Sequence, residues 1–418
     1  MRIMIPWRPL LASCVVAIPM AGCRDASAPV RARGVVVAEE RDGASEESSP
    51  VVTIDHQVPV ISTVPANAGE AVHLFVRERV RGDVVDGRQR EAVLMLHGRS
   101  VSILPGMELR YGDYDWALWL ARSGGVDVFM LDLQGSGRSP RPKMDDPCNL
   151  PLDQRALVPV SSPPCLSNQA PYPFTLNTTG SDLDEIDAVV DYIRQLRGVE
   201  KVHLVSWSQG SFRAGPYAVR HPGKVASLFL FAPIFNTAFR PTTPPAVLPR
   251  AGTPMTLRTR ADVFAGNGTN TGWDPEVKCE GQREPGIEDI VWAAIMNDDD
   301  VGRTWHAPEG VMRVREVVQW GWNADVASQL TVPTLIIRGE FDSGQGGLQQ
   351  VHELYGLVNN DNKLRFTVQC AGHYMVWEQQ RWILQQVSKE WLKHGRVGGF
   401  DHGEFRIDTQ GNLTPDIP

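Results

Sequence analysis

The sequence predicts an α/β fold in which helices cover a mostly parallel β-sheet. Seven short apolar runs, rich in β-branched residues, are predicted to be buried strands, because they are too short for helices. Strands that alternate with helices are typical of a parallel sheet covered on both faces. The predicted strands span residues 72–80, 92–96, 127–131, 201–205, 225–231, 333–337 and 363–368.

Three segments between or after these runs have the spacing of amphipathic helices. They span residues 113–122, 181–196 and 374–392, and Ser181 is the expected N-cap of the second. Their alternation with the predicted strands supports the parallel sheet.

Length and composition are those of a globular, core-forming chain. The 418 residues exceed one ordinary domain, and 42% of them are hydrophobic and 22% charged. The net charge is −8, and no patch of Lys and Arg stands out. We therefore expect no nucleic-acid partner.

Residues 1–22 are predicted to be a signal peptide. Arg2 and Arg8 precede an apolar stretch, 9–20, that is too short to span a membrane comfortably. The following Met-Ala-Gly-Cys resembles a bacterial lipobox, which implies cleavage before Cys23 and lipidation of its thiol. The alternative is an ordinary secretory signal. We expect an exported protein, anchored to a bacterial membrane through its lipid alone or otherwise secreted.

Residues 23–69 are expected to form a flexible tether. This stretch is rich in Ala, Ser, Glu, Arg and Pro and has few aromatic residues. Such a composition cannot bury enough apolar surface to offset the entropy lost on ordering. Residues 51–64 leave room for one strand that leads into the fold.

The α/β core is expected in two parts, 70–233 and 326–395, followed by a C-terminal tail, 396–418. Residues 234–325 separate two predicted strands by far more than a loop needs, so we predict an inserted subdomain there. A second, shorter insertion, 139–174, is rich in Pro.

Four cysteines remain once the one in the signal peptide and the one at the lipidation site are set aside. Export permits disulfides, and we predict one between Cys148 and Cys165, which lie in the same Pro-rich insertion. A second pairing, of Cys279 with Cys370, stays open. The cysteines show no spacing typical of a metal site.

A sharp strand–turn–helix motif is predicted around Ser208. The sequence Ser-Trp-Ser-Gln-Gly, from Ser206 to Gly210, follows the apolar strand 201–205. A nucleophile elbow needs small residues two before and two after its serine, because the turn brings these backbones together. Ser208 would then be exposed at the N-terminus of a helix, where developing negative charge is favoured.

The loop after strand 92–96 resembles the oxyanion loop of the α/β-hydrolase superfamily. It begins with His97 and Gly98. The resemblance implies that the backbone N–H groups of Arg99 and Gln209 are the oxyanion donors. His97 itself is expected to be structural.

The turn from Asp132 to Ser139 has the form Asp-x-x-Gly-x-Gly-x-Ser, which resembles the turn after the next strand in this superfamily. We expect Asp132 to bond this turn rather than to act as a catalytic acid. A phosphate-binding loop is disfavoured, because no Lys-Ser or Lys-Thr pair follows the glycines.

Two more motifs follow Ser208 in the order that the superfamily requires. One predicted strand ends in Gly-Glu-Phe-Asp at Asp342, and the last ends in Gly-His at His373. The resemblance, which covers about residues 72–392, implies that His373 is the general base and that Asp342 orients it. Glu340 is the competing acid, less favoured by its position.

These resemblances imply a serine hydrolase that cleaves a carboxylic ester through an acyl-enzyme intermediate. An amidase or aminopeptidase of the same fold stays open, because three consecutive aspartates, 298–300, would suit the grip of a substrate amine. A binding protein that has lost the chemistry is disfavoured, since no member of the triad is missing. Acyl transfer needs no cofactor, so none is expected.

The inserted subdomain, 234–325, is expected to be a helical cap over Ser208, since this superfamily inserts caps at that place and ligands bind at that end of the sheet. Segments 287–296 and 311–320 are its predicted helices. About half of its large apolar residues, with Trp292 and Trp320 foremost, are expected to line a pocket for an apolar group of a small-molecule ester. The residues considered are Phe264, Trp273, Ile290, Val291, Trp292, Ile295, Met296, Trp305, Val311, Met312, Trp320 and Trp322.

Overall fold

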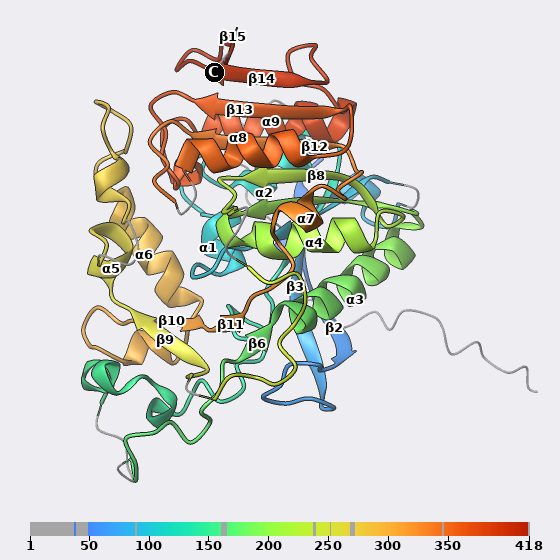
Figure 1. Cartoon of the computed structure of the whole chain (residues 1–418). Coiled ribbons are helices and arrows are strands. Elements are labelled where there is room, and N and C mark those ends of the chain that lie inside the picture. Colours follow the sequence, from blue (N-terminus) through green and yellow to red (C-terminus); the bar gives the residue numbers. More distant parts are fainter. Residues whose placement is uncertain are drawn as a thin grey trace, which may run out of the picture. The chain divides into compact units, whose positions relative to one another are not determined.

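Within the described part of the chain, the largest sheet has 11 strands in the order β1-β2-β3-β5-β4-β7-β8-β12-β13-β14-β15 (Figure 1). Every neighbouring pair from β5 to β14 in this order is parallel, and the pairs at both edges are antiparallel. The bounds are β1 Val37–Ala38, β2 Val51–Ile61, β3 Ala71–Arg81, β4 Ala92–Leu96, β5 Asp127–Leu131, β7 Val202–Trp207, β8 Val225–Phe231, β12 Thr334–Gly339, β13 Lys363–Val368, β14 Gly403–Ile407 and β15 Leu413–Pro415. All seven predicted strands are present.

The computed structural model describes residues 37–38, 49–87, 90–159, 165–236, 240–250, 252–267, 272–344 and 347–416. These residues lie within one compact unit, Arg31–Pro418. The predicted signal peptide, 1–22, and the predicted lipidation site, Cys23, fall outside the described residues. Among the described helices, none has both the length and the apolar character that crossing a membrane requires.

Helices cover both faces of the sheet (Figure 1). Residues of α2 and α9 pack into one hydrophobic cluster, and residues of α3, α4 and α8 pack into another. In β4, Val93 and Met95 belong to the first cluster, whereas Leu94 and Leu96 belong to the second, because successive strand residues point to opposite faces. The helices are α1 Ile103–Met107, α2 Trp116–Ser123, α3 Thr179–Arg197, α4 Ser211–Arg220, α5 Arg260–Phe264, α6 Ile287–Asn297, α7 Ala324–Ala327, α8 Gly347–Leu357 and α9 Arg381–His394.

Helix α3 begins before the predicted N-cap. Thr178 is the N-cap, and its hydroxyl accepts the Ser181 backbone N–H at 3.1 Å. The Ser181 hydroxyl accepts the Thr178 backbone N–H at 3.0 Å in return. This reciprocal capping box places Ser181 inside the first turn, so the prediction of Ser181 as the N-cap was wrong.

The sheet extends beyond the seven predicted strands at both edges. Strand β2 lies within residues 51–64, where the sequence left room for a strand, and it pairs with β3 along 11 residues. The predicted tail, 396–418, contains β14 and β15, so that prediction was wrong. Phe405 of β14 is buried and stacks on Phe366 of β13 with ring centroids 5.9 Å apart. This contact joins distant segments, which the local sequence pattern does not mark.

The inserted subdomain is mixed rather than purely helical. The predicted helix 287–296 is present as α6, but the predicted helix 311–320 is wrong, because these residues form β10 (Met312–Arg315) and β11 (Val317–Val318). β10 pairs with β9 (Met255–Arg258), and β11 pairs with β6 (Asn177–Thr178). Figure 1 shows α5, α6, β9 and β10 grouped beyond the carboxyl ends of the sheet strands.

Two disulfides are present in the described part of the chain. Cys148 and Cys165 are bonded inside the Pro-rich insertion, across a sequence separation of 17 residues. Cys279 and Cys370 are bonded across a separation of 91 residues. The second bond ties the inserted subdomain to the end of β13, close to His373.

Because the second disulfide closes the longer loop, we expect it to stabilise the fold more. The chain-entropy relation gives about 5 kcal/mol for the bond between Cys279 and Cys370 and about 3 kcal/mol for the bond between Cys148 and Cys165. Equilibrium unfolding in urea of the two paired Cys→Ser variants, each with the other disulfide intact, measures the difference. An equal or larger loss in the Cys148→Ser, Cys165→Ser variant would contradict this ranking.

Candidate active site

Ser208 stands at a strained turn between β7 and α4. Its backbone has a φ of 57°, in the left-handed region that is costly for a residue other than glycine. A Cβ at Gly210 would lie 3.0 Å from the His97 carbonyl oxygen and 3.1 Å from the Ser206 Cβ. The turn therefore needs small residues on both sides of Ser208, and serine at 206 is small enough.

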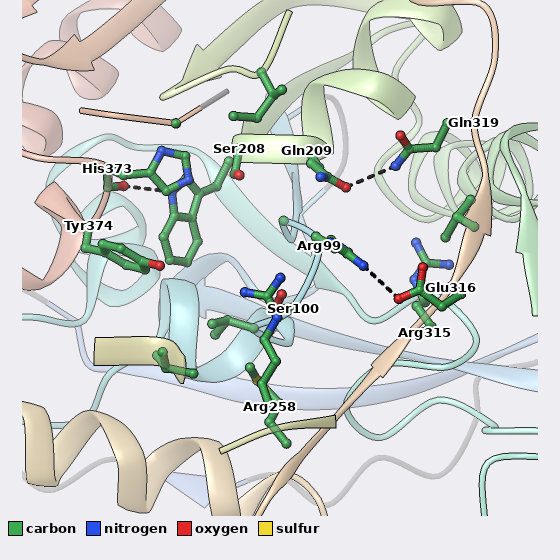
Figure 2. A pocket seen from close by; sticks show the side chains of 18 of the residues that line it. Arg99, Ser100, Ser208, Gln209, Arg258, Arg315, Glu316, Gln319, His373 and Tyr374 are labelled. Carbon is green, nitrogen blue, oxygen red and sulfur yellow. Dashed lines mark hydrogen bonds and ion pairs between the residues drawn. The ribbon is translucent and has the colours of Figure 1, made fainter. Parts of the chain in front are cut away.

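His373 and Asp342 form a hydrogen-bonded pair at the ends of adjacent strands. The His373 Nδ1 lies 2.9 Å from the Asp342 Oδ1, and the Asp342 carboxylate also accepts the Gly344 backbone N–H at 2.9 Å. The Trp207 indole N–H donates to the His373 carbonyl oxygen at 3.0 Å (Figure 2). The loop after β13 that carries His373, residues 369–374, is called the histidine loop. It is thereby held against the turn that carries Ser208.

The competing acids have other partners. Glu340 accepts the Cys370 backbone N–H at 3.2 Å and pairs with Arg406 at the surface. Asp132 accepts two backbone N–H groups, from Ile103 at 2.9 Å and Arg138 at 3.1 Å, as a turn-bonding residue does. The buried His97 ring lies 2.7 Å from the Gly98 carbonyl oxygen, within its own loop.

The pKa values of His373 and Asp342 shift in opposite directions, and in each case neighbouring charges outweigh the effect of burial. Burial by itself would lower the His373 pKa, but the carboxylates of Asp342 and Glu276 outweigh burial and raise it above its ordinary value. Burial would raise the Asp342 pKa, but the neighbouring His373 outweighs it and lowers that pKa to about 2. Asp342 is therefore ionised across the neutral range, which favours a protonated Nδ1 on His373.

Glu276, in the inserted subdomain, binds the histidine loop and was not predicted from the sequence. Its carboxylate accepts the backbone N–H of His373 and, at 2.8 Å, that of Ser343. Burial and the Asp342 charge raise the Glu276 pKa, while His373 opposes the shift. No local pattern marks this residue, because its role depends on the subdomain folding over the core.

Glu378 also binds the histidine loop. Its carboxylate accepts the Gly372 backbone N–H at 2.8 Å and the Trp273 indole N–H at 2.8 Å. Burial raises the pKa of Glu378 to about 7. A Cβ at Gly372 would lie 2.7 Å from the Glu276 carboxylate and 3.0 Å from that of Glu378, so these contacts require glycine before His373.

A cavity of about 350 Å³ contains both Ser208 and His373 in its lining (Figure 2). Arg99 and Gln209, whose backbone N–H groups are the predicted oxyanion donors, line the same cavity. The Gln209 side chain accepts a hydrogen bond from Gln319 at 3.0 Å. Apart from His373, the ionisable Arg and Glu side chains of the lining are four arginines and two glutamates: Arg99, Arg240, Arg258, Arg315, Glu276 and Glu316. Arginines therefore outnumber carboxylates.

Most of the subdomain residues expected to line the pocket lie elsewhere, and the subdomain's apolar contribution to the cavity is Ile234, Val263, Met312 and Val317. Neither Trp292 nor Trp320 lines the cavity, and of the twelve apolar residues considered only Met312 does. The Trp292 indole N–H donates to the Glu309 carbonyl oxygen, and the Trp320 ring lies under the Arg220 guanidinium. The Trp292 ring is therefore bonded within the subdomain, and the Trp320 ring packs against Arg220 at the end of α4.

The three aspartates 298–300 are absent from the lining of this cavity. Asp298 binds the Ser102 hydroxyl and Arg138, and Asp299 forms an ion pair with Arg313 at 2.6 Å. Asp298, through these contacts, and Asp299, which also pairs with Arg141 at 3.1 Å, connect the subdomain to residues outside it, whereas Asp300 pairs with Arg303 inside it. None of the three is placed to hold a substrate amine in the cavity that contains Ser208. Among the described residues, no group of three or more His, Cys, Asp and Glu side chains is arranged to hold a metal ion.

The sequence profile of the alpha/beta hydrolase fold family matches residues 91–380, more than half of the chain. The chain belongs to this family. The match includes Ser208, Asp342 and His373, and it extends across the inserted subdomain, 234–325. In an α/β-hydrolase the nucleophile, acid and histidine occur in that chain order.

Several solved structures resemble this α/β-hydrolase. A thermophilic esterase from Thermogutta terrifontis is 17% identical, with a TM-score of 0.47, over 81% of this chain and 98% of that one. A serine hydrolase from Cycloclasticus zankles is 15% identical, with a TM-score of 0.47, over 83% and 100%. The 2-hydroxy-6-oxo-6-phenylhexa-2,4-dienoate hydrolase from Rhodococcus sp. strain RHA1 is 16% identical, with a TM-score of 0.46, over 82% and 99%. No match was found among curated proteins.

The contact between Glu276 and the histidine loop predicts a shift in pH dependence. As the predicted general base, His373 must be neutral to accept a proton, so we expect kcat/KM to fall as the pH drops below its raised pKa. Glu276→Gln removes a carboxylate that raises this pKa, and the acid limb of the kcat/KM profile should move to lower pH. Glu284→Gln, at a carboxylate that binds Tyr111 and Tyr114 instead, is the matched control. An acid limb that stays in place in Glu276→Gln would contradict the assignment.

Proposed function

We propose that this α/β-hydrolase cleaves a carboxylic ester through an acyl-enzyme intermediate. One observation carries the proposal: the strained Ser208 lines the same cavity as His373, whose ring is hydrogen-bonded to Asp342. Acyl transfer needs an exposed nucleophile, a base in the same cavity and a group that orients the base.

In the proposed reaction, His373 Nε2 takes the hydroxyl proton of Ser208 as the oxygen attacks the ester carbonyl. The Asp342 carboxylate holds the proton on Nδ1 and stabilises the imidazolium that forms. The backbone N–H groups of Arg99 and Gln209 would stabilise the oxyanion, an effect typically worth about 3 kcal/mol for one donor. His373 then protonates the leaving alkoxide, and water releases the acyl group by the reverse sequence.

The matched triad variants test this mechanism. Ser208→Ala and His373→Ala should each lower kcat by at least about a thousandfold, because the two residues act as one unit. Asp342→Asn should cost less than Ser208→Ala but still orders of magnitude, through a wrong imidazole tautomer. Turnover of chromogenic esters and labelling by a fluorophosphonate are the measurements, with Ser123→Ala on α2 as control. Near wild-type turnover in Ser208→Ala would refute the proposal.

We also propose that the protein is exported and anchored through a lipid on Cys23. Two disulfides support an oxidising compartment, because disulfides persist mainly outside the cytoplasm. The charged and apolar pattern of residues 1–22 and the lipobox-like sequence before Cys23 support the anchor.

Fractionation of bacterial cells tests the anchor. The wild-type chain should incorporate labelled fatty acid and sediment with membranes, whereas Cys23→Ser should lose the label and no longer sediment with them. Cys14→Ser, inside the predicted signal peptide, is the matched control and should keep the label. A Cys23→Ser protein that keeps the label would show that the lipid is attached to another residue and would refute the proposal.

A further inference from the structure

Arg258, the last residue of β9, is a buried cation that faces the cavity. Its side chain is 9% exposed and lines the same cavity as Ser208 and His373. Among the residues that the structure describes, none forms a hydrogen bond or an ion pair with its guanidinium. An isolated charge taken out of water is costly unless a partner compensates it.

The other arginines of the cavity all have partners. Arg99 pairs with Glu316 at 2.7 Å, and Arg315 pairs with the buried Asp182 at 2.7 Å. Arg240 donates to Gln319 at 2.6 Å and lies over the Phe212 ring. Arg258 therefore differs from the other three arginines of the cavity, because no described residue forms a hydrogen bond or an ion pair with it.

Neither carboxylate of the cavity is available to Arg258. Glu316 is engaged by Arg99 and by the Thr256 hydroxyl at 2.8 Å, and Glu276 is engaged by the histidine loop. Burial, reinforced by Arg99, lowers the Arg258 pKa, while the charges of Glu316 and Asp262 partly oppose this shift, and a guanidinium remains protonated at neutral pH. The cavity therefore contains a positive charge with which no described residue pairs directly.

The local fold fixes this charge in place. β9 pairs with β10 through Arg258 and Met312, and Thr259 then caps α5. Residues two apart on a strand share a face, so Arg258 and Thr256 point the same way, and the partner of Thr256, Glu316, lines the cavity. Figure 2 shows the Arg258 side chain extending from the subdomain toward the part of the cavity beside Ser100.

We propose that Arg258 binds a carboxylate of the substrate, so that the preferred ester carries a second, ionised carboxyl group. This inference rests on the proposed ester hydrolysis and names its substrate class. The planar guanidinium matches a carboxylate with two parallel hydrogen bonds, and burial strengthens them. A phosphate-type dianion fits less well, because Glu276 and Glu316 line the same cavity and would repel the second charge.

Three ethyl esters that differ only in the group at the far end of the acyl chain test the proposal. Monoethyl adipate ends in a carboxylate, the second ester ends in an isopropyl group of similar shape, and the third ends in a phosphonate. The wild-type kcat/KM should be at least about tenfold higher for monoethyl adipate than for the isopropyl ester, as expected for a charge-assisted hydrogen-bonded pair. Arg258→Gln should reduce this ratio by about tenfold or more, and Arg258→Lys should reduce it less.

Arg260→Gln is the matched control. This neighbouring arginine pairs with Asp289 outside the cavity, so the ratio and the activities should stay at wild-type values. A wild-type ratio near one, or an unchanged ratio in Arg258→Gln, would overturn the proposal. Preference for the phosphonate ester would overturn the choice of carboxylate.

Binding without turnover separates this proposal from the proposed reaction. Calorimetry should show that Ser208→Ala binds monoethyl adipate at least about tenfold more tightly than Ser208→Ala with Arg258→Gln does. Equal affinities would refute the role of Arg258. If Ser208→Ala loses turnover of the uncharged ester, that result tests only the role of the nucleophile. If Arg258→Gln does not fold, the wild-type ester ratio and the ratio in Arg258→Lys still test the role of Arg258.

Discussion

The left-handed backbone of Ser208 is the constraint on which the rest of the site depends. A φ of 57° persists at a serine only where the surrounding structure holds the turn. β7 is fixed between β4 and β8, and a Cβ at Gly98 would lie 3.3 Å from the Ser208 Cβ. The order of the parallel strands therefore fixes the position of the hydroxyl, and the loop that begins at His97 packs directly against Ser208.

The histidine loop depends on the inserted subdomain as well as on the core. Glu276 reaches the loop from the subdomain, and the disulfide between Cys279 and Cys370 joins the same two segments covalently. The charge of Glu276 also helps to raise the His373 pKa. A change in the subdomain is thereby coupled to the proton affinity of His373 and to the shape of the cavity.

The aromatic residues of the subdomain build a core instead of a cavity wall. Trp273 packs against Trp377 with ring centroids 5.6 Å apart, and Trp322 packs against Phe235 at 5.5 Å. The cavity instead receives polar side chains from β9 and from the segment around β10. Composition indicated an apolar pocket, but a small subdomain needs its large apolar side chains to bury its own surface.

The sequence by itself determined the strands that are buried on both faces, the steric pattern of the turn at Ser208, and the order of the motifs that end at Asp342 and His373. These features depend on neighbours within a few residues, through side-chain periodicity and local backbone sterics. Only the tertiary structure decided that residues 403–415 extend the sheet, and that Glu276 and Arg258 enter the site. Strand pairing and electrostatics depend on distances between segments that are remote in the sequence, and only the folded chain sets those distances.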